Sequence, residues 1–367
     1  MNISMALLLI SFLSFTLNLT AMECEFSPEN ESHKVLEAIR FAKKHHHGQF
    51  RKFDGLPYFT HPVRVAKIVK KQTQDTDLII AAYLHDLIED TTVNKRWIKK
   101  KFGKRIANIV SELTSDPSKI EKMGSKAEYL ADKMLKMSPE ALLIKLADRL
   151  DNVSDFESAE LDFINKYRAE TNYILTKLSK RNDLNESHKS LITQIFKKMS
   201  DGEKLYQAKV FGRKNHRNLK ANIVESDFIL QATKVSGLLA KRAVPVNLRS
   251  VVYMIGVSKT NEQERYQEVK RYFGEETANL VEEINSNLFL NRPLDQLSDN
   301  ALLIRLAGVL ENLNEILRME AVHDYRDYIK LSRNRIKQLD KSSRALNQDQ
   351  LYFANRIKIA LKNTNKF

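Results

Sequence analysis

Apolar residues recur at helical spacing along most of this 367-residue chain. Positions i, i+3 and i+4 are repeatedly apolar, whereas the period-two alternation of a β-strand is scarce. Only 10 glycines and 7 prolines interrupt the pattern, and the helix-favouring residues lysine, glutamate, leucine and alanine are plentiful. The pattern predicts an all-α protein, and the length allows two domains.

The helical pattern has a small number of breaks. It begins near residue 34, stops at a loop over residues 53–57, and then runs from Pro62 to about Leu205. Glycine and proline in the loop break helices, and a proline suits a first helical turn. A basic, polar stretch over residues 212–218 is expected to connect two domains.

The second half of the chain repeats the apolar pattern of the first. Residues 83–86 align with residues 253–256, and residues 142–148 align with residues 302–308. Self-similarity over so long a period indicates duplicated units. The predicted helical domains span residues 34–205 and 219–365.

One apolar segment carries an unusual set of polar side chains. It holds an imidazole and three carboxylates, namely His85, Asp86, Glu89 and Asp90. Residues four apart lie on one face of a helix, so the spacing predicts a single helix face that presents all of them. Such groups are costly to bury unless a metal or a reaction uses them. Two further candidate ligands, His61 and Asp148, lie on other segments.

The duplication separates core positions from site positions. In the second half these six polar positions are replaced by Gln231, Ile255, Gly256, Lys259, Thr260 and Gly308. The apolar positions are kept, whereas every group that could bind a metal or move a proton is lost. We therefore expect the first domain to carry a site and the second to be a degenerate copy.

The candidate metal ligands are His61, His85, Asp86 and Asp148. Two imidazoles and two carboxylates suit Mn²⁺ or another borderline divalent ion better than Mg²⁺ or structural zinc. Such an ion would acidify a water molecule and polarise a phosphoryl oxygen. Glu89 and Asp90 could orient or deprotonate that water. For a single His-Asp pair, a surface or capping role would be the alternative.

Four segments carry a resemblance to a known family. They are Gly48–Lys52, Gly55–Pro62, Leu84–Thr91 and Lys145–Asn152. Residues 34–200 are similar to the hydrolase domain of the RelA/SpoT family, which belongs to the HD metal-dependent phosphohydrolases. The resemblance implies an all-helical HD-domain bundle with one Mn²⁺. It also implies removal of pyrophosphate from the ribose 3′ position of guanosine tetra- or pentaphosphate.

The resemblance also implies roles for individual residues. The four candidate ligands would hold the metal, and Glu89 and Asp90 would handle the water and the proton. Arg51, Lys52 and Asn152 would lie near the nucleotide. Two departures matter: position 151 is Asp where the family often has His, and one residue is added between Arg51 and His61. In the family a synthetase domain often follows the hydrolase domain, whereas here the degenerate repeat occupies that place. The chain therefore resembles a stand-alone hydrolase.

Charge favours anionic partners. The net charge of +14 attracts nucleotides, nucleic acid or an anionic membrane, although a basic, solvated surface would account for it equally well. Seven basic residues lie between Lys95 and Arg105 with Trp97 as the main aromatic, so we do not expect a nucleic-acid-binding surface. The single cysteine, Cys24, excludes a disulfide framework. The tract His45–His47 is expected to be an exposed helix end.

The first 22 residues carry no charge, and Ala6–Ala21 is largely apolar. This segment is short for a membrane span and is typical of a signal-peptide core, with cleavage expected near Ala21. No basic residue precedes it, so an uncleaved anchor or a mis-assigned start is the alternative. We expect an exported protein with no stable membrane span in its mature form, the alternative being a cytoplasmic one.

The leading functional hypothesis is a Mn²⁺-dependent hydrolase of guanosine tetra- and pentaphosphate. A related alternative is hydrolysis of another nucleotide, such as the 2′-phosphate of NADPH. A different class, a nucleotide-binding or interaction protein without catalysis, stays open because the second repeat has lost its site. The second repeat is expected to stabilise the first or to mediate homo-oligomerisation.

Overall fold

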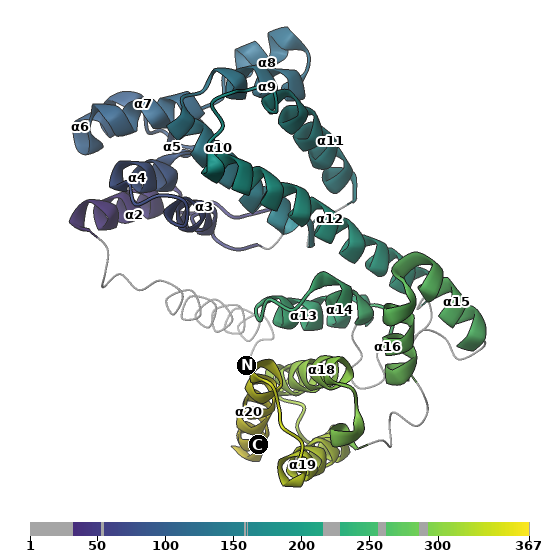
Figure 1. Ribbon diagram of the computed structural model, residues 1–367. Coiled ribbons are helices and arrows are strands. Elements are labelled where there is room, and N and C mark those ends of the chain that lie inside the picture. The colour runs from purple at the N-terminus through teal and green to yellow at the C-terminus, as the bar shows by residue number, and fades with distance from the viewer. Residues whose placement is uncertain are drawn as a thin grey trace, which may run out of the picture. The chain divides into compact units, whose positions relative to one another are not determined.

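The computed structural model describes residues 32–52, 55–157, 159, 161–215, 228–255, 262–285 and 293–366. The predicted signal peptide, residues 1–22, lies outside these ranges. All regular elements within them are helices (Figure 1), and the one β-type pairing there is an isolated bridge between Phe50 and Pro57. The all-α prediction is confirmed.

Contacts divide the chain into two compact units, with the division between Lys198 and Met199. The first unit contains α2 (His33–His45), α3 (Thr60–Lys70), α4 (Thr76–Leu84), α5 (Leu87–Asp90), α6 (Lys95–Phe102), α7 (Lys104–Leu113), α8 (Pro117–Met123), α9 (Lys126–Lys136), α10 (Pro139–Ser154), a 3₁₀ turn (Asp155–Glu157), α11 (Leu161–Leu178) and the start of α12 (Glu186–Asn215).

The core of the first unit forms around α4 and α10. Residues 78–84 of α4 are all buried, as expected for a helix that is apolar on every side. The α10 helix packs against α3, α4 and α7, so its inward face meets the first turn of α3 and the end of α4. Burying each large aliphatic side chain contributes about 1.5–3 kcal/mol. This packing brings the three segments that carry the candidate ligands together.

The helix expected to carry His85 through Asp90 is interrupted, so that prediction was wrong. The α4 helix ends at Leu84, and α5 begins at Leu87 after a turn in which Asp86 has φ −94° and ψ −4°. His85 is buried, whereas Glu89 and Asp90 are exposed. No glycine or proline marks the turn, so apolar periodicity alone cannot locate it.

The second unit contains the end of α12, α13 (Phe228–Ala240), α14 (Val246–Val251), α15 (Glu262–Phe273), α16 (Glu275–Asn285), a 3₁₀ turn (Leu294–Gln296), α18 (Asp299–Arg318), α19 (Arg326–Lys341), α20 (Gln348–Asn363) and a final 3₁₀ turn (Thr364–Lys366). Its helices follow the order of the first unit, with α13 in the place of α3 and α18 in the place of α10. Tyr83 and Tyr253, which align in the sequence, are both buried. These features are consistent with the predicted tandem duplication.

The connection expected at residues 212–218 is helical as far as Asn215. Gly212 does not break α12. A Cβ atom at this position would lie 2.6 Å from the carbonyl oxygen of Tyr253, so glycine here permits close packing. The end of α12 at residues 203–215 aligns with α2 of the first unit at the spacing of the repeat, and its apolar residues belong to the core of the second unit.

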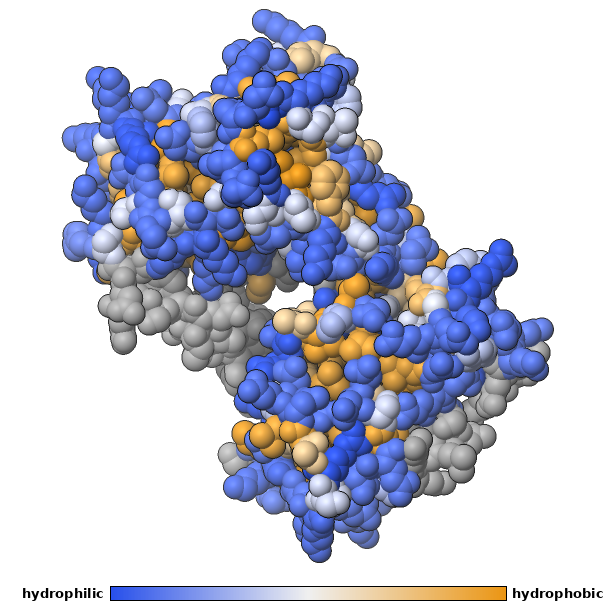
Figure 2. Space-filling view, in the orientation of Figure 1, coloured by the Kyte–Doolittle hydropathy of each residue, from blue (hydrophilic) through white to orange (hydrophobic). Residues whose placement is uncertain are grey.

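The visible surface is mostly hydrophilic, with apolar side chains showing between the polar ones (Figure 2). None of the helices in the described ranges combines the length and the apolar character that a membrane span requires.

Candidate metal centre

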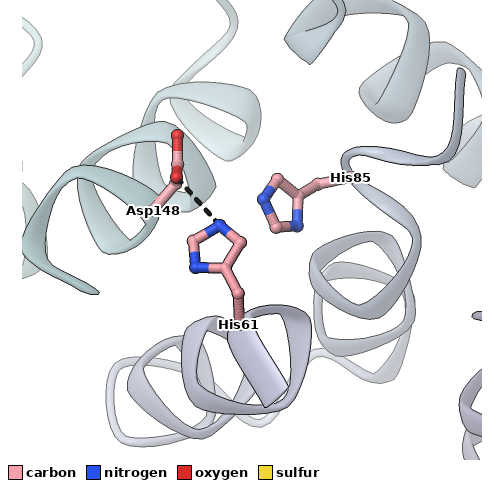
Figure 3. Close-up of side chains that lie close together, drawn as sticks. All are labelled: His61, His85 and Asp148. Carbon is pink, nitrogen blue, oxygen red and sulfur yellow. Dashed lines mark ion pairs between the residues drawn. The ribbon is translucent and has the colours of Figure 1, made fainter. Parts of the chain in front are cut away.

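Three buried side chains converge on one point of the first unit (Figure 3). His61 lies in the first turn of α3, His85 in the turn after α4, and Asp148 in the middle of α10. One ligand atom of each lies within 4.8 Å of those of the other two. The His61 Nε2 atom is 3.2 Å from Asp148 Oδ1. Three of the four predicted ligands therefore share one site.

The fourth predicted ligand, Asp86, borders the same point. Its Oδ2 atom lies 3.1 Å from His85 Nε2 and 3.5 Å from His61 Nε2. The Tyr58 hydroxyl donates a hydrogen bond of 2.8 Å to this oxygen and so fixes its orientation. Two imidazole nitrogens and carboxylate oxygens from two aspartates thus surround one position.

The hydrogen bonds of His85 show that the site fits a cation. His85 Nδ1 lies 2.8 Å from the Ala82 carbonyl oxygen, which can only accept, so Nδ1 carries a hydrogen. In the neutral ring Nε2 then presents a lone pair toward the Asp86 carboxylate, which is also an acceptor. His85 Nε2 is buried and has no hydrogen bond. A divalent ion between these two acceptors would satisfy both, so the residues present fit a metal.

The pKa values describe the same site when a proton takes the place of the metal. Burial disfavours a charged His61, but hydrogen bonds to Asp148 and Asp151 outweigh it and raise the pKa of His61 to about 9. Burial likewise opposes ionisation of Asp148, yet Lys145 and His61 hold its pKa well below the usual range. The site is therefore built for a compact positive charge among ionised carboxylates.

A cavity of about 230 Å³ opens beside the metal position. Its lining includes Glu89, Lys126, Lys145, Asp148 and Asn152. Lys145 Nζ lies 2.8 Å from Asp148 Oδ2, and Asn152 Nδ2 donates to Asp148 Oδ1 at 2.7 Å. The predicted Asn152 thus lines the cavity and orients a ligand.

Sequence reasoning missed both cavity lysines. Lys145 precedes Asp148 by three residues, so it shares a helix face with that ligand and this spacing could have identified it. Lys126 begins α9, and no local pattern links it to the site.

The two proposed proton-handling residues differ in their surroundings. Glu89 lines the cavity, and its Oε2 accepts a hydrogen bond of 2.8 Å from the Ser115 amide. Although Asp90 is exposed as a residue, desolvation of its carboxyl group and the negative charge of Asp86 raise its pKa. A carboxylate with a raised pKa accepts a proton more readily, so Asp90 stays a candidate general base, whereas Glu89 is the one of the two that lines the described cavity.

Arg51 lies in a different environment from the one that the resemblance implies. It is buried, forms an ion pair with Asp155, and has its second guanidinium nitrogen 3.5 Å from Asp151 Oδ2. Lys52 is exposed. The described lining of the cavity includes neither residue. A nucleotide-binding role for Arg51 and Lys52 stays a prediction.

The His45–His47 tract lies at the end of α2, as expected, but of its three side chains only that of His47 is exposed. His46 is buried, and its Nδ1 lies 2.7 Å from Gln49 Oε1. Gln49 Nε2 in turn donates to the Asp90 carbonyl at 2.8 Å, so His46 supports the segment that holds α5.

In the second unit, the described positions equivalent to His61, His85 and Asp148 hold the uncharged residues Gln231, Ile255 and Gly308. Gln231, which aligns with His61, donates from Nε2 to Asn312 Oδ1 at 2.9 Å, and Asn312 donates to the Tyr328 hydroxyl at 3.0 Å. Within the described ranges, the one group of His, Cys, Asp and Glu residues suited to a metal is that of the first unit. The replacements at 256, 259 and 260 lie outside the described residues.

The comparisons with known proteins agree with this geometry. The family model described as "HD domain" matches residues 38–185. A human guanosine-3′,5′-bis(diphosphate) 3′-pyrophosphohydrolase is 37% identical over 131 residues, covering 34% of this chain and 71% of the relative. The bifunctional (p)ppGpp synthase/hydrolase SpoT of Escherichia coli is 35% identical over 164 residues, covering 42% of this chain and 23% of the relative.

A solved structure described as a metazoan ortholog of SpoT that hydrolyses ppGpp is 28% identical, with a TM-score of 0.41, over 46% of this chain and 96% of its own. The chain spans less than a third of the length of the bacterial relatives it matches first.

The helical fold and the matched model define an HD-domain protein. More narrowly, the chain belongs to the HD-domain family of guanosine-3′,5′-bis(diphosphate) 3′-pyrophosphohydrolases, since it covers most of the human relative at 37% identity.

Proposed function

We propose that this protein is a Mn²⁺-dependent hydrolase that removes the 3′-pyrophosphate of guanosine tetra- and pentaphosphate. The observation that carries the proposal is the buried cluster of His61, His85 and Asp148, with Asp86 beside it. The names of the relatives support the choice of substrate. The mixture of imidazole and carboxylate donors supports Mn²⁺ as the ion.

His61, His85, Asp86 and Asp148 would hold the ion, which when bound supplies Lewis acidity to a phosphoryl oxygen and to the attacking water. The chain itself positions the other reactants. Lys126 and Lys145 in the cavity wall offset the charge of the diphosphate.

Proton transfer falls to the α5 carboxylates. Water attacks the phosphorus atom bonded to the ribose 3′ oxygen, and Asp90 takes the proton from that water. The bond between this phosphorus and the 3′ oxygen breaks, and the proton that Asp90 took from the water passes to this oxygen, which leaves as the ribose 3′ hydroxyl. The products are pyrophosphate and guanosine 5′-diphosphate from the tetraphosphate, or guanosine 5′-triphosphate from the pentaphosphate. Glu89, whose Oε2 accepts a hydrogen bond from the Ser115 amide, lines the cavity.

The test is turnover by the purified full-length chain with guanosine tetraphosphate and Mn²⁺, with products separated by ion-exchange chromatography. We expect equal amounts of pyrophosphate and guanosine diphosphate, and no turnover by Asp148→Asn. Release of orthophosphate from NADPH, with no hydrolysis of guanosine tetraphosphate (the alarmone), would instead identify a 2′-phosphatase. Alarmone binding with no turnover above the Asp148→Asn control would identify a binding protein.

We also propose that the protein is exported, on the basis of the uncharged, apolar segment at Ala6–Ala21. A reporter enzyme fused after residue 30 is expected to leave the cytoplasm. Retention of that reporter inside the cell would contradict export without bearing on the hydrolase activity.

A further inference from the structure

Asp151 is a buried carboxylate directly behind the metal site. It is 3% exposed and accepts hydrogen bonds from His61 Nδ1 at 2.6 Å and from Arg64 Nε at 2.7 Å. A nitrogen of the Arg51 guanidinium lies 3.5 Å from the same carboxylate. Three donors from the segment before α3 and from α3 itself therefore meet at one side chain of α10.

These contacts determine the state of the His61 ring. An ionised carboxylate can only accept hydrogen bonds, so His61 Nδ1 carries a hydrogen. The Nε2 atom of the neutral ring then presents its lone pair toward Asp148 and Asp86, as metal binding requires. A carboxylate that orients a metal-binding histidine in this way commonly supports ion affinity.

A second carboxylate shares the arginines. Asp155 forms an ion pair with Arg51 and lies 3.5 Å from an Arg64 guanidinium nitrogen. The described contacts of Asp155 join it to the arginines, whereas Asp151 alone of the two contacts His61. The two aspartates can therefore serve as test position and control. Both contact Arg51 and Arg64, and Asp151 also contacts His61.

We propose that Asp151 is a positioning residue that fixes His61 as a metal ligand, and that Arg51 orients this carboxylate instead of binding the nucleotide. The inference rests on the proposed function only in requiring that the site hold a divalent ion.

Asparagine at either position would test the inference because it replaces an acceptor with an amide donor. In Asp151→Asn, an NH2 group replaces one of the two carboxylate oxygens. This hydrogen-bond donor must then point at the donor of at least one of His61, Arg64 and Arg51. The imidazole is the one partner that can respond by moving its hydrogen to Nε2, which then cannot bind an ion. In Asp155→Asn, the new NH2 group points at the donors of Arg51 and Arg64 only, and His61 keeps its contact with the Asp151 carboxylate.

The experiment measures Mn²⁺ and Co²⁺ affinity of the metal-free full-length protein by competition with a fluorescent chelator. For Asp151→Asn we expect affinity about 10- to 100-fold weaker than wild type. Its Co²⁺ absorption spectrum should also change, because one imidazole ligand is lost. Asp155→Asn should bind within about threefold of wild type with an unchanged spectrum. Equal loss of affinity in both variants would overturn the inference, since Asp151 would then serve only the fold.

Wild-type protein provides an independent measurement if Asp151→Asn fails to fold. Histidine ¹⁵N chemical shifts of the Zn²⁺-loaded chain should show His61 with hydrogen on Nδ1 and the ion on Nε2. The opposite assignment, or a wild-type chain that binds no divalent ion, would refute the inference. Tight ion binding without alarmone hydrolysis would refute the proposed substrate and leave the role of Asp151 intact.

Discussion

Lys145 and Asp148, one turn apart on α10, form a largely buried ion pair with an Nζ–Oδ2 distance of 2.8 Å. The other carboxylate oxygen, Oδ1, faces His61. The lysine therefore neutralises one oxygen of the Asp148 carboxylate, while the other oxygen is directed at the candidate metal position. Burial opposes a charged Lys145, but Asp148 and Asp86 outweigh it and raise the pKa of the lysine.

Replacing Lys145 with methionine should destabilise the metal-free protein and leave the metal-loaded protein less affected. Removing one partner of a buried ion pair costs about 3–5 kcal/mol, because the remaining charge is uncompensated. Mn²⁺ bound at Asp148 should compensate that charge. Urea unfolding with and without Mn²⁺ measures both values, and a loss that Mn²⁺ does not reduce would show that Asp148 does not bind the ion.

Replacing Asp90 with asparagine should lower kcat by about 10²- to 10⁴-fold with a small change in KM, because a general base acts only as the transition state forms. Glu89→Gln is the matched variant on the same short helix, and its effect should be smaller because Glu89 accepts a hydrogen bond from Ser115. Steady-state kinetics compare them. A larger loss of kcat for Glu89→Gln than for Asp90→Asn would identify Glu89, and not Asp90, as the general base.

Affinity for the divalent ion should fall as the pH is lowered below about 9. The raised pKa of His61 means that an ion must displace a proton below that pH, so affinity drops by about tenfold for each pH unit. The stability of the metal-free chain should change with pH in the opposite direction. Protonated His61 stabilises the folded state fully below pH 6.5, and this contribution is lost as the pH rises through about 9. Chelator competition between pH 6.5 and 9 provides the measurement, and a flat profile would contradict it.

Acid should destabilise the first unit through His188. This buried ring lies 2.9 Å from the Pro139 carbonyl through Nε2, and its Nδ1 accepts from the Asn185 amide at 3.2 Å. Burial lowers the pKa of His188 below 6.5, so the unfolded chain binds a proton that the folded chain refuses. Stability present above pH 6.5 should be lost as the pH falls, with a slope of at most about 1.4 kcal/mol per pH unit.

The control for this effect is His188→Gln, which cannot titrate. Urea unfolding of metal-free protein between pH 7.5 and 5 should show a shallower pH dependence for the variant than for the wild type. Parallel curves for the two proteins would assign the acid sensitivity to other groups.

Local patterns in the chain were sufficient to predict the helical class and the duplication, and they also selected the candidate ligand residues. Helical periodicity needs only neighbouring residues, and His61, His85, Asp86 and Asp148 were identifiable because the repeat keeps the apolar positions and loses these four. The convergence of three of them within 4.8 Å agrees with that prediction.

Tertiary structure alone decided the turn between α4 and α5, the place of Lys126 in the cavity wall and the partners of Arg51. Arg51 and Asp155 are 104 residues apart in the chain, and packing of α10 against α3 brings their segments together. Sequence periodicity records which residues face a core, but it does not record which charged groups meet there. These contacts between charged groups depend on long-range packing, and here they set the hydrogen bonding of His61 and the surroundings of Asp90.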